Sequence, residues 1–247
     1  MKEVLPNFAQ TNIKKVMKKL SLLVGGIILS GAVLAQKPSS DVPMTLEGQI
    51  GYNASTLAFT APSIRFRYFL TDNIAARVTL GMTNVSRTEN AYEFADNTGA
   101  NGTAEFKSTA INAAIGAEYH FAGTDRLSPY VGLDIMFGGG NTSSDYENAA
   151  GPQGGVGYVA DRTQTTEAKT SMFGVNLVAG ADYYFAENFY IGLELGLGWM
   201  SFTTKEGSNT VTTGTNPTVT TETFTPESTD SFLGNNAIGN LRLGWRF

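Results

Sequence analysis

The sequence of 247 residues predicts an all-β fold, an eight-stranded antiparallel up-and-down transmembrane β-barrel, and three observations favour it. Apolar and polar residues alternate in eight segments, as they do where the two faces of a strand meet different surroundings. The connections between these segments alternate between short and long. The last segment reaches the chain end and finishes in an aromatic residue, Phe247.

Residues 1–35 have the pattern of a signal peptide. A cluster of lysines at positions 14, 15, 18 and 19 precedes an apolar run from Leu20 to Leu34, and the small residue Ala35 ends it. The run of 15 residues is shorter than the roughly 18 or more expected of a spanning helix. We therefore expect a cleaved leader, with a retained anchor helix as the alternative. Either Met1 or Met17 serves as the start, and residues 36–43 form a short periplasmic segment.

The composition is typical of amphipathic strands rather than of apolar helices. Mean hydropathy is −0.09, and only 16% of residues are charged, against about a quarter in soluble domains. Beyond the leader, 12 basic residues face 21 acidic ones, so no nucleic-acid partner is expected. One His and no Cys exclude a disulfide framework and a Cys/His metal cluster, and we expect no cofactor.

The barrel is predicted over residues 44–247, and most of its strands reach the roughly 9–11 residues that a tilted strand needs to cross a bilayer. In order, the predicted strands are 44–53, 61–70, 74–85, 108–121, 129–137, 169–185, 189–203 and 232–247. The strongest alternation lies in 189–203, where Phe189, Ile191, Leu193, Leu195, Leu197 and Trp199 oppose three glycines and Glu194.

The connections fall into two sets. Residues 71–73, 122–128 and 186–188 are short turns flanked by aromatic residues, which we expect to form a girdle at the membrane interface. Residues 86–107, 138–168 and 204–231 are long polar loops, and 54–60 is the short member of that set. This asymmetry is typical of outer-membrane barrels, with both chain ends at the periplasmic rim. A soluble β-sandwich is the competing interpretation, and the leader and the loop asymmetry argue against it.

Five arginines and five acids occupy the polar face of the strands. They are Arg65, Arg67, Arg77, Arg242 and Arg246, and Glu47, Glu118, Asp134, Asp182 and Glu194. Since an eight-stranded barrel is only wide enough for its own side chains, we expect these charges to pair inside it. Inward glycines leave room for the arginines. The sequence therefore predicts a lumen filled by a balanced ion-pair network, rather than an ion-conducting pathway.

Two further features bear on function. His120, the only His, lies beside a short turn, so we expect a structural residue at the interface or in the lumen rather than a catalytic base. Residues 204–231 are rich in Thr, and Gly214 to Pro217 is a turn signal. They form either a protruding hairpin whose edge accepts an extracellular partner or a flexible polar loop.

These features resemble the small outer-membrane barrel family of OmpX and the OmpA transmembrane domain. The residues that carry the resemblance are the leader, the alternating strands, the segment Pro129-Tyr130-Val131-Gly132-Leu133-Asp134 and the terminal Trp245-Arg246-Phe247. The resemblance implies contact with outer-membrane lipid and lipopolysaccharide. It also implies that the barrel-assembly machinery reads the last strand, with Trp245 and Phe247 as the assembly signal.

The resemblance implies a non-catalytic protein with a structural or adhesion-like role that its long extracellular loops carry. The alternative is a small porin-like channel for ions or small solutes. A lipid-modifying or proteolytic barrel is the third and most distant possibility.

Overall fold

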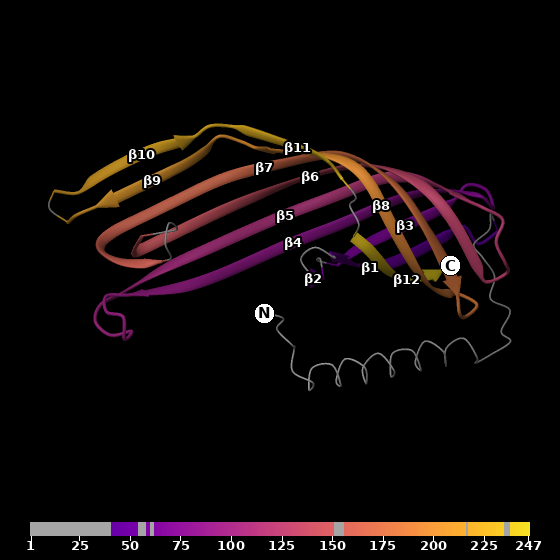
Figure 1. The fold of residues 1–247 in the computed structure, drawn as a ribbon, viewed down its shortest axis with the longest axis horizontal. Helices are drawn as coiled ribbons and strands as arrows, with labels where there is room; N and C mark the ends of the chain where they lie inside the picture. Colours follow the sequence, from indigo (N-terminus) through magenta and orange to yellow (C-terminus); the bar gives the residue numbers. More distant parts are fainter. Residues whose placement is uncertain (1–40, 54–57, 60–61, 151–155, 216, 235–237) are drawn as a thin grey trace, which may run out of the picture.

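The computed structural model describes residues 41–53, 58–59, 62–150, 156–215, 217–234 and 238–247, and its regular elements are β-strands (Figure 1). They are β1 (Met44–Asn53), β2 (Ala58–Phe59), β3 (Ser63–Phe69), β4 (Ile74–Tyr92), β5 (Asn101–His120), β6 (Leu127–Ala150), β7 (Gly157–Tyr184), β8 (Phe189–Thr204), β9 (Gly207–Thr213), β10 (Val219–Thr225), β11 (Ser228–Gly234) and β12 (Ile238–Arg246). Within the described ranges, no helix has the length and apolar character to span a membrane. The predicted leader and residues 36–40 lie outside the described residues.

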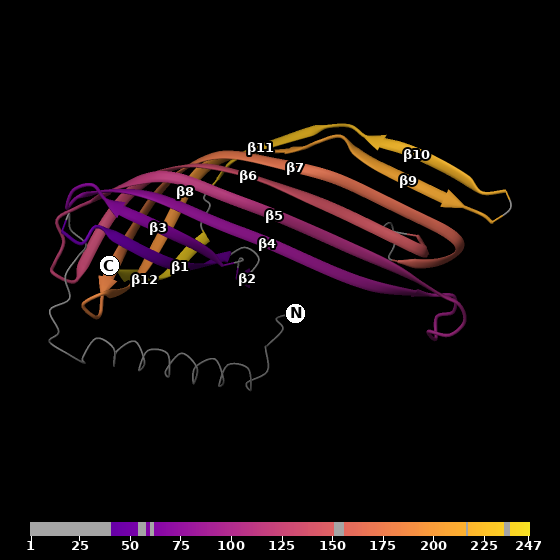
Figure 2. The ribbon, with the colours of Figure 1, turned by 180° about the vertical axis from the view of Figure 1, so that it is seen from behind.

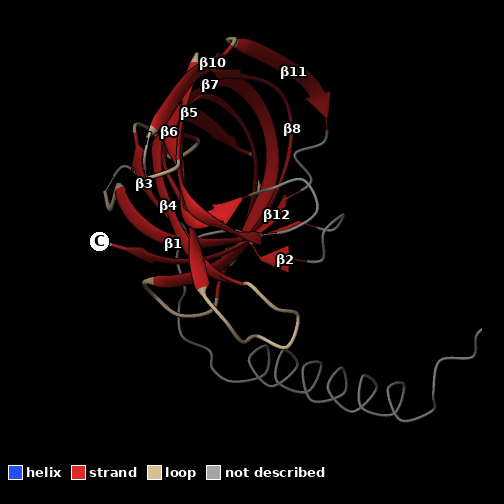
Figure 3. Cartoon of the chain, turned by 90° about the vertical axis from the view of Figure 1, so that its left-hand side faces the viewer, coloured by secondary structure: helices blue, strands red, loops and turns tan. Residues whose placement is uncertain are grey.

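Eight strands close into a ring. β1, β3, β4, β5, β6, β7, β8 and β12 pair in that order, all antiparallel, and β12 pairs back with β1 from Thr45 opposite Arg246 to Asn53 opposite Ile238. Figure 3 looks along this ring. The predicted all-β, eight-stranded antiparallel barrel is confirmed, with every predicted strand present in its predicted order.

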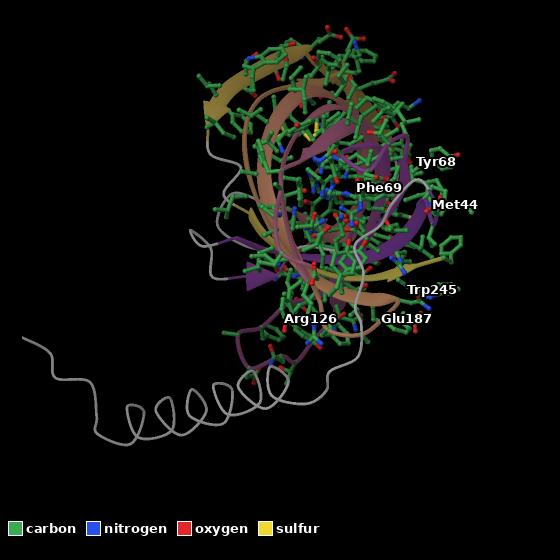
Figure 4. The ribbon with its side chains drawn as sticks, turned by 90° about the vertical axis from the view of Figure 1, so that its right-hand side faces the viewer. Met44, Tyr68, Phe69, Arg126, Glu187 and Trp245 are labelled. Carbon is green, nitrogen blue, oxygen red and sulfur yellow. The ribbon has the colours of Figure 1, made fainter. Side chains whose placement is uncertain are left out.

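Three tight connections and the chain end lie at one end of the barrel, which we call the turn rim. Residues 70–73, 121–126 and 185–188 join β3 to β4, β5 to β6 and β7 to β8. The backbone N–H of Phe247 donates to the carbonyl oxygen of Met44 at 3.0 Å, which fastens the last residue to the start of β1. Figure 4 views this end, where Met44, Arg126, Glu187 and Trp245 lie. The three predicted short turns are confirmed.

The prediction of long loops at the opposite end is wrong for most of their length. β4 and β5 stay paired to Tyr92 opposite Asn101, and β6 and β7 stay paired to Ala150 opposite Gly157. The outward apolar residues end earlier because the outer face of these extensions is polar, whereas Ala104 and Tyr146 are buried on the inner face. Thr and other β-branched residues favour strands even so, and a paired neighbour on each side keeps them extended. We call this end the extended rim.

Large apolar side chains face outward around the ring, most with 37–64% of their surface exposed. They include Leu46, Ile64, Val78, Leu80, Ile115, Leu133, Ile135, Leu177, Leu193, Leu195, Leu197, Leu241 and Leu243. Towards the extended rim this belt ends near Phe137, Phe173 and Trp199. Phe137 on β6 lies directly opposite Phe173 on β7, and Trp199 on β8 lies opposite Val175, two residues further along β7. Such a belt of exposed side chains is stable in lipid and not in water.

The aromatic residues beside the short turns do not all join the outer girdle. Tyr68, Tyr119, Phe121 and Phe189 are 44–49% exposed on the outside. Phe69 is only 2% exposed and lies on the face opposite to that of Tyr68 (Figure 4), because alternate residues of a strand point to opposite faces. Tyr184 and Tyr190 are fully buried for the same reason. The expected girdle is therefore only half correct, since the alternate set fills the barrel at the turn rim.

Residues 204–231 contain the protruding hairpin, the first of the two alternatives predicted for them. β9 pairs with β10 from Gly207 opposite Thr225 to Thr213 opposite Val219, and β9 also pairs with β7. The two ends of the segment belong to the barrel wall, because β11 pairs with β8 from Ser228 opposite Thr204. In Figures 1 and 2 the β9–β10 hairpin projects at the far end of the long strands.

Candidate functional site

All ten charged residues predicted on the polar face lie inside the barrel, with 0–5% of their surface exposed. Each strand of the ring contributes at least one. They are Glu47 on β1, Arg65 and Arg67 on β3, Arg77 on β4, Glu118 on β5, Asp134 on β6, Asp182 on β7, Glu194 on β8, and Arg242 and Arg246 on β12.

The layer nearer the turn rim is organised around Arg67. Its guanidinium lies 2.5 Å from Glu47, 2.9 Å from Glu118 and 2.8 Å from Asp182. Arg242 on β12, the other neighbour of β1, also contacts Glu47 and Asp182, at 3.1 Å and 2.5 Å. Two arginines and two acids therefore form a closed square that spans the lumen.

The layer nearer the extended rim is organised around Arg77 and Arg65. Arg77 donates through Nε and Nη2 to the two carboxylate oxygens of Asp134, at 2.7 and 2.5 Å. Arg65 forms a similar two-pronged contact with Glu194, at 2.8 and 2.9 Å. Arg77 also reaches Glu118 at 2.7 Å, which links the two layers into one network.

Arg246 is buried at the end of β12, and its backbone N–H donates to the carbonyl oxygen of Asn188 at 2.8 Å. It therefore ties the last strand to the β7–β8 turn. No three His, Asp or Glu side chains of the described part of the chain are grouped as metal ligands would be.

Buried tyrosines complete the network, and sequence reasoning missed them. Tyr190 accepts a hydrogen bond from Arg67 at 2.7 Å, and Tyr130 donates one to Glu194 at 2.6 Å. The guanidiniums of Arg67 and Arg242 lie 5.1 Å from the ring centres of Tyr190 and Tyr130. The alternation of the strands indicates this inward placement, because Tyr130 and Tyr190 are an even number of positions away from Asp134 and Glu194 and so lie on the same face.

His120 lies in the lumen between Ser128 and Glu118. Its Nδ1 is 2.9 Å from Ser128 Oγ, and its Nε2 is 3.0 Å from Glu118 Oε2. The order of serine, histidine and acid matches that of a hydrolase triad. However, Ser128 and His120 are each 2% exposed, and Glu118 is also bound by two arginines. Ser128 is therefore closed off from solvent in this structure, and the three side chains satisfy one another's polar atoms.

Inward glycines make this filling possible. A Cβ atom at Gly192 would lie 2.5 Å from Nη2 of Arg242 and 2.7 Å from Asp182. One at Gly244 would overlap the ring of Tyr190. The large side chains of the network therefore lie beside glycines, which have no side chain that would clash with them.

The sheet beyond the belt carries its own small core. On its concave face, Ala91, Ala104, Tyr146 and Ala149 are buried to 4% exposure or less, and Phe106 packs edge-on against Tyr146. Further along, Asn209 accepts hydrogen bonds from Gln164 at 2.8 Å and Thr166 at 2.9 Å, which fastens β9 to β7. These contacts hold the extension as a defined sheet.

Comparison with known proteins agrees with this architecture. Residues 58–206 match the family model described as "Putative OmpA-OmpF-like porin family". No curated protein matches the chain in sequence.

Solved structures of outer-membrane proteins match the chain at low sequence identity. The N-terminal β-barrel domain of Pseudomonas aeruginosa OprF is 18% identical over 83% of this chain and 98% of its own, with a TM-score of 0.35. A major outer membrane protein of Thermus thermophilus is 11% identical over 83% and 98%, with a TM-score of 0.46. Ail, the attachment invasion locus protein of Yersinia pestis, is 12% identical over 83% and 97%, with a TM-score of 0.31.

Proposed function

We propose that this chain, which belongs to the OmpA-OmpF-like porin family and is a bacterial outer-membrane β-barrel, acts as a non-catalytic surface protein. The turn rim and both chain ends face the periplasm. The extended rim faces outward and makes an adhesion-like contact with a polypeptide partner. The barrel holds this sheet in the membrane, among lipid and lipopolysaccharide, and the last strand with Trp245 and Phe247 serves as the assembly signal.

The observation that carries the proposal is the open sheet beyond the apolar belt. β6 and β7 stay in continuous register for ten residues past Phe173, to Glu147 opposite Thr163, which is about 30 Å along the strand. β3 pairs with β4 only as far as Gly81, and β10 pairs only with β9 among the described strands. The edges of this sheet at β4 and β10 therefore present unpaired backbone groups, which accept a strand from another chain.

The β10 edge is the better suited of the two to a partner. Every residue from Val219 to Thr225 is exposed, and the only charged one is Glu222. Natural edges that must stay single usually carry several charges, a bulge or a proline. Phe224 adds an aromatic side chain that is 60% exposed, which supplies an apolar anchor beside the backbone contacts.

The family description favours a second candidate, a small channel. The ion-pair network argues against a channel. Charged side chains from every strand of the ring, together with two tyrosines, pair with one another across the lumen in two layers. Ions would have to separate several buried pairs to pass, and a buried charge left without its partner costs about 3–5 kcal/mol.

A hairpin-shortened variant tests the proposal. Lys205 and Glu227 form an ion pair at 3.2 Å across the base of the hairpin, one residue beyond Thr204 opposite Ser228. Residues 206–226 are therefore replaced by Asn-Gly, which makes a tight two-residue turn. We expect this variant to fold and insert normally. Attachment of expressing cells to a serum-coated surface should fall to that of cells without the protein, and unchanged attachment would reject the proposal.

A further inference from the structure

A cavity of about 410 Å³ lies inside the barrel between the ion-pair network and the extended rim. Arg65, Asp134 and Glu194 of the network are among its lining residues. Its volume is within the range of about 300–1,000 Å³ that small-molecule sites occupy. Neither the structural role of the network nor the surface contact proposed above uses this space.

The cavity has two chemically different walls. Met136, Met172, Met200 and Phe202, from β6, β7 and β8, line most of one side. Asn176 of β7 adds a buried amide oxygen without a hydrogen-bond partner among the described residues, below these methionines and beside the charged floor. Gln49, Ser63, Thr79, Asn112 and Asn240 line the other side, from β1, β3, β4, β5 and β12. A cavity with one apolar and one polar wall fits an amphiphilic molecule better than a sugar or an ion.

Glycines on neighbouring strands leave the space that the methionine side chains of this wall occupy. A Cβ atom at Gly138 would lie 3.2 Å from the ε-methyl of Met172, and one at Gly174 would lie 3.2 Å from that of Met136 and 2.8 Å from Cγ of Met200. Methionine is flexible and polarizable, so such a wall adapts to apolar chains of different shape.

The charges at the floor are already matched. Both carboxylate oxygens of Glu194 accept from Arg65, and both of Asp134 accept from Arg77. A charged ligand head would find no free partner there and would lose its hydration. By contrast, Gln49, which is 3% exposed, receives one hydrogen bond from Ser63 at 3.3 Å and donates one to Glu47 at 3.4 Å, which leaves one amide N–H and one carbonyl lone pair for a ligand.

The geometry points to a lumenal site for an uncharged, chain-like amphiphile, with its alkyl chain on the methionine wall and a hydroxyl- or amide-bearing head on the amide wall. The ligand enters from the extended rim, because the network fills the barrel below. The site is independent of the β10 edge, so the hairpin-shortened variant retains it.

Methionine methyl NMR tests this site directly. The full chain in lipid nanodiscs is labelled with ¹³C at the methionine ε-methyls and titrated with 1-octanoyl-glycerol. Octanoate and octyltrimethylammonium serve as charged probes with the same chain. Met44, at the start of β1, lies at the turn rim and does not line the cavity, so it reports simple partitioning of the probes.

We expect saturable shifts at Met136, Met172 and Met200 with the neutral probe, at least tenfold weaker binding of both charged probes, and no saturable shift at Met44. Gly81→Leu fills the cavity without a backbone clash, because a Cβ there meets only Ser63 Cβ at 3.5 Å. It should abolish the saturable shifts. Gly48→Leu, where a Cβ meets nothing within 4 Å, is the matched control and should retain them.

Three results would overturn the site. The first is that the lumenal methyls shift no more than Met44, the second is that the saturable shifts survive in folded Gly81→Leu, and the third is that a charged probe binds as tightly as the neutral one. The dispersed methyl spectrum of each variant shows whether it is folded.

Discussion

Replacement of Glu118 by Gln removes the charge that joins the two layers of the lumenal network. The carboxylate lies 2.9 Å from Arg67, 2.7 Å from Arg77 and 3.0 Å from His120, with Arg65 at 3.9 Å. Gln has nearly the same shape, so the substitution leaves no cavity. It leaves buried arginines with one counter-charge fewer, and removal of one partner of a buried pair costs about 3–5 kcal/mol.

The same substitution at Glu105 is the matched control. Glu105 lies on the same strand and pairs with Lys107 at 3.0 Å, but their side chains are 40% and 52% exposed. Solvent screens such a pair, so its loss should cost at most about 1 kcal/mol. Urea unfolding in phosphatidylcholine vesicles, followed by the fluorescence of Trp199 and Trp245, gives both free energies.

A double-mutant cycle with Arg67→Gln separates charge imbalance from simple loss of contacts. The double variant should be more stable than the sum of the single losses implies, by about 1–3 kcal/mol, since it restores the charge balance. The reasoning is refuted if Glu118→Gln costs no more than Glu105→Gln, or if the two losses simply add.

Three further predictions concern the glycines, the extension and Ser128. Gly192→Ala and Gly244→Ala should each lower the unfolding free energy by about 1–3 kcal/mol through overpacking, whereas Gly48→Ala, with open space around it, should not; equal losses would contradict the filled lumen. Trypsin added to intact cells should spare Lys205, whose backbone N–H donates to Lys169 at 2.8 Å; rapid cleavage there would contradict the paired extension. A fluorophosphonate probe should not label the protein, because Ser128 is buried; labelling that Ser128→Ala abolishes would establish a hydrolase.

The alternation of the sequence sufficed to predict the ring and the side of the wall on which each charge lies. A period of two assigns Arg77 and Glu118 to one face and Val78 and Ile115 to the other, whatever the exact pairing partners are. The partners themselves depend on strand register and barrel closure, which no local pattern encodes. Thus the sequence did not indicate that Arg67 would meet Asp182.

The extended rim was mispredicted because apolar alternation was used to mark where strands end. That alternation marks only where one face meets lipid. β5 between Asn101 and Ala110 has a polar outer face, with Ala104 and Phe106 on the inner face, and its strand is maintained by pairing with β4 and β6. Buried tyrosines were missed for a related reason, since an aromatic residue beside a turn fits the outer girdle and the lumen equally well.

Conductance in a planar lipid bilayer tests the central claim, that the lumen is closed by its own charges and the protein acts through its outer surface. The purified full chain should give no stable unitary conductance above that of the protein-free bilayer, since both network layers must open for an ion to pass. A large, stable conductance that Glu194→Ala or Arg77→Ala abolishes would contradict the claim and assign the protein a channel function.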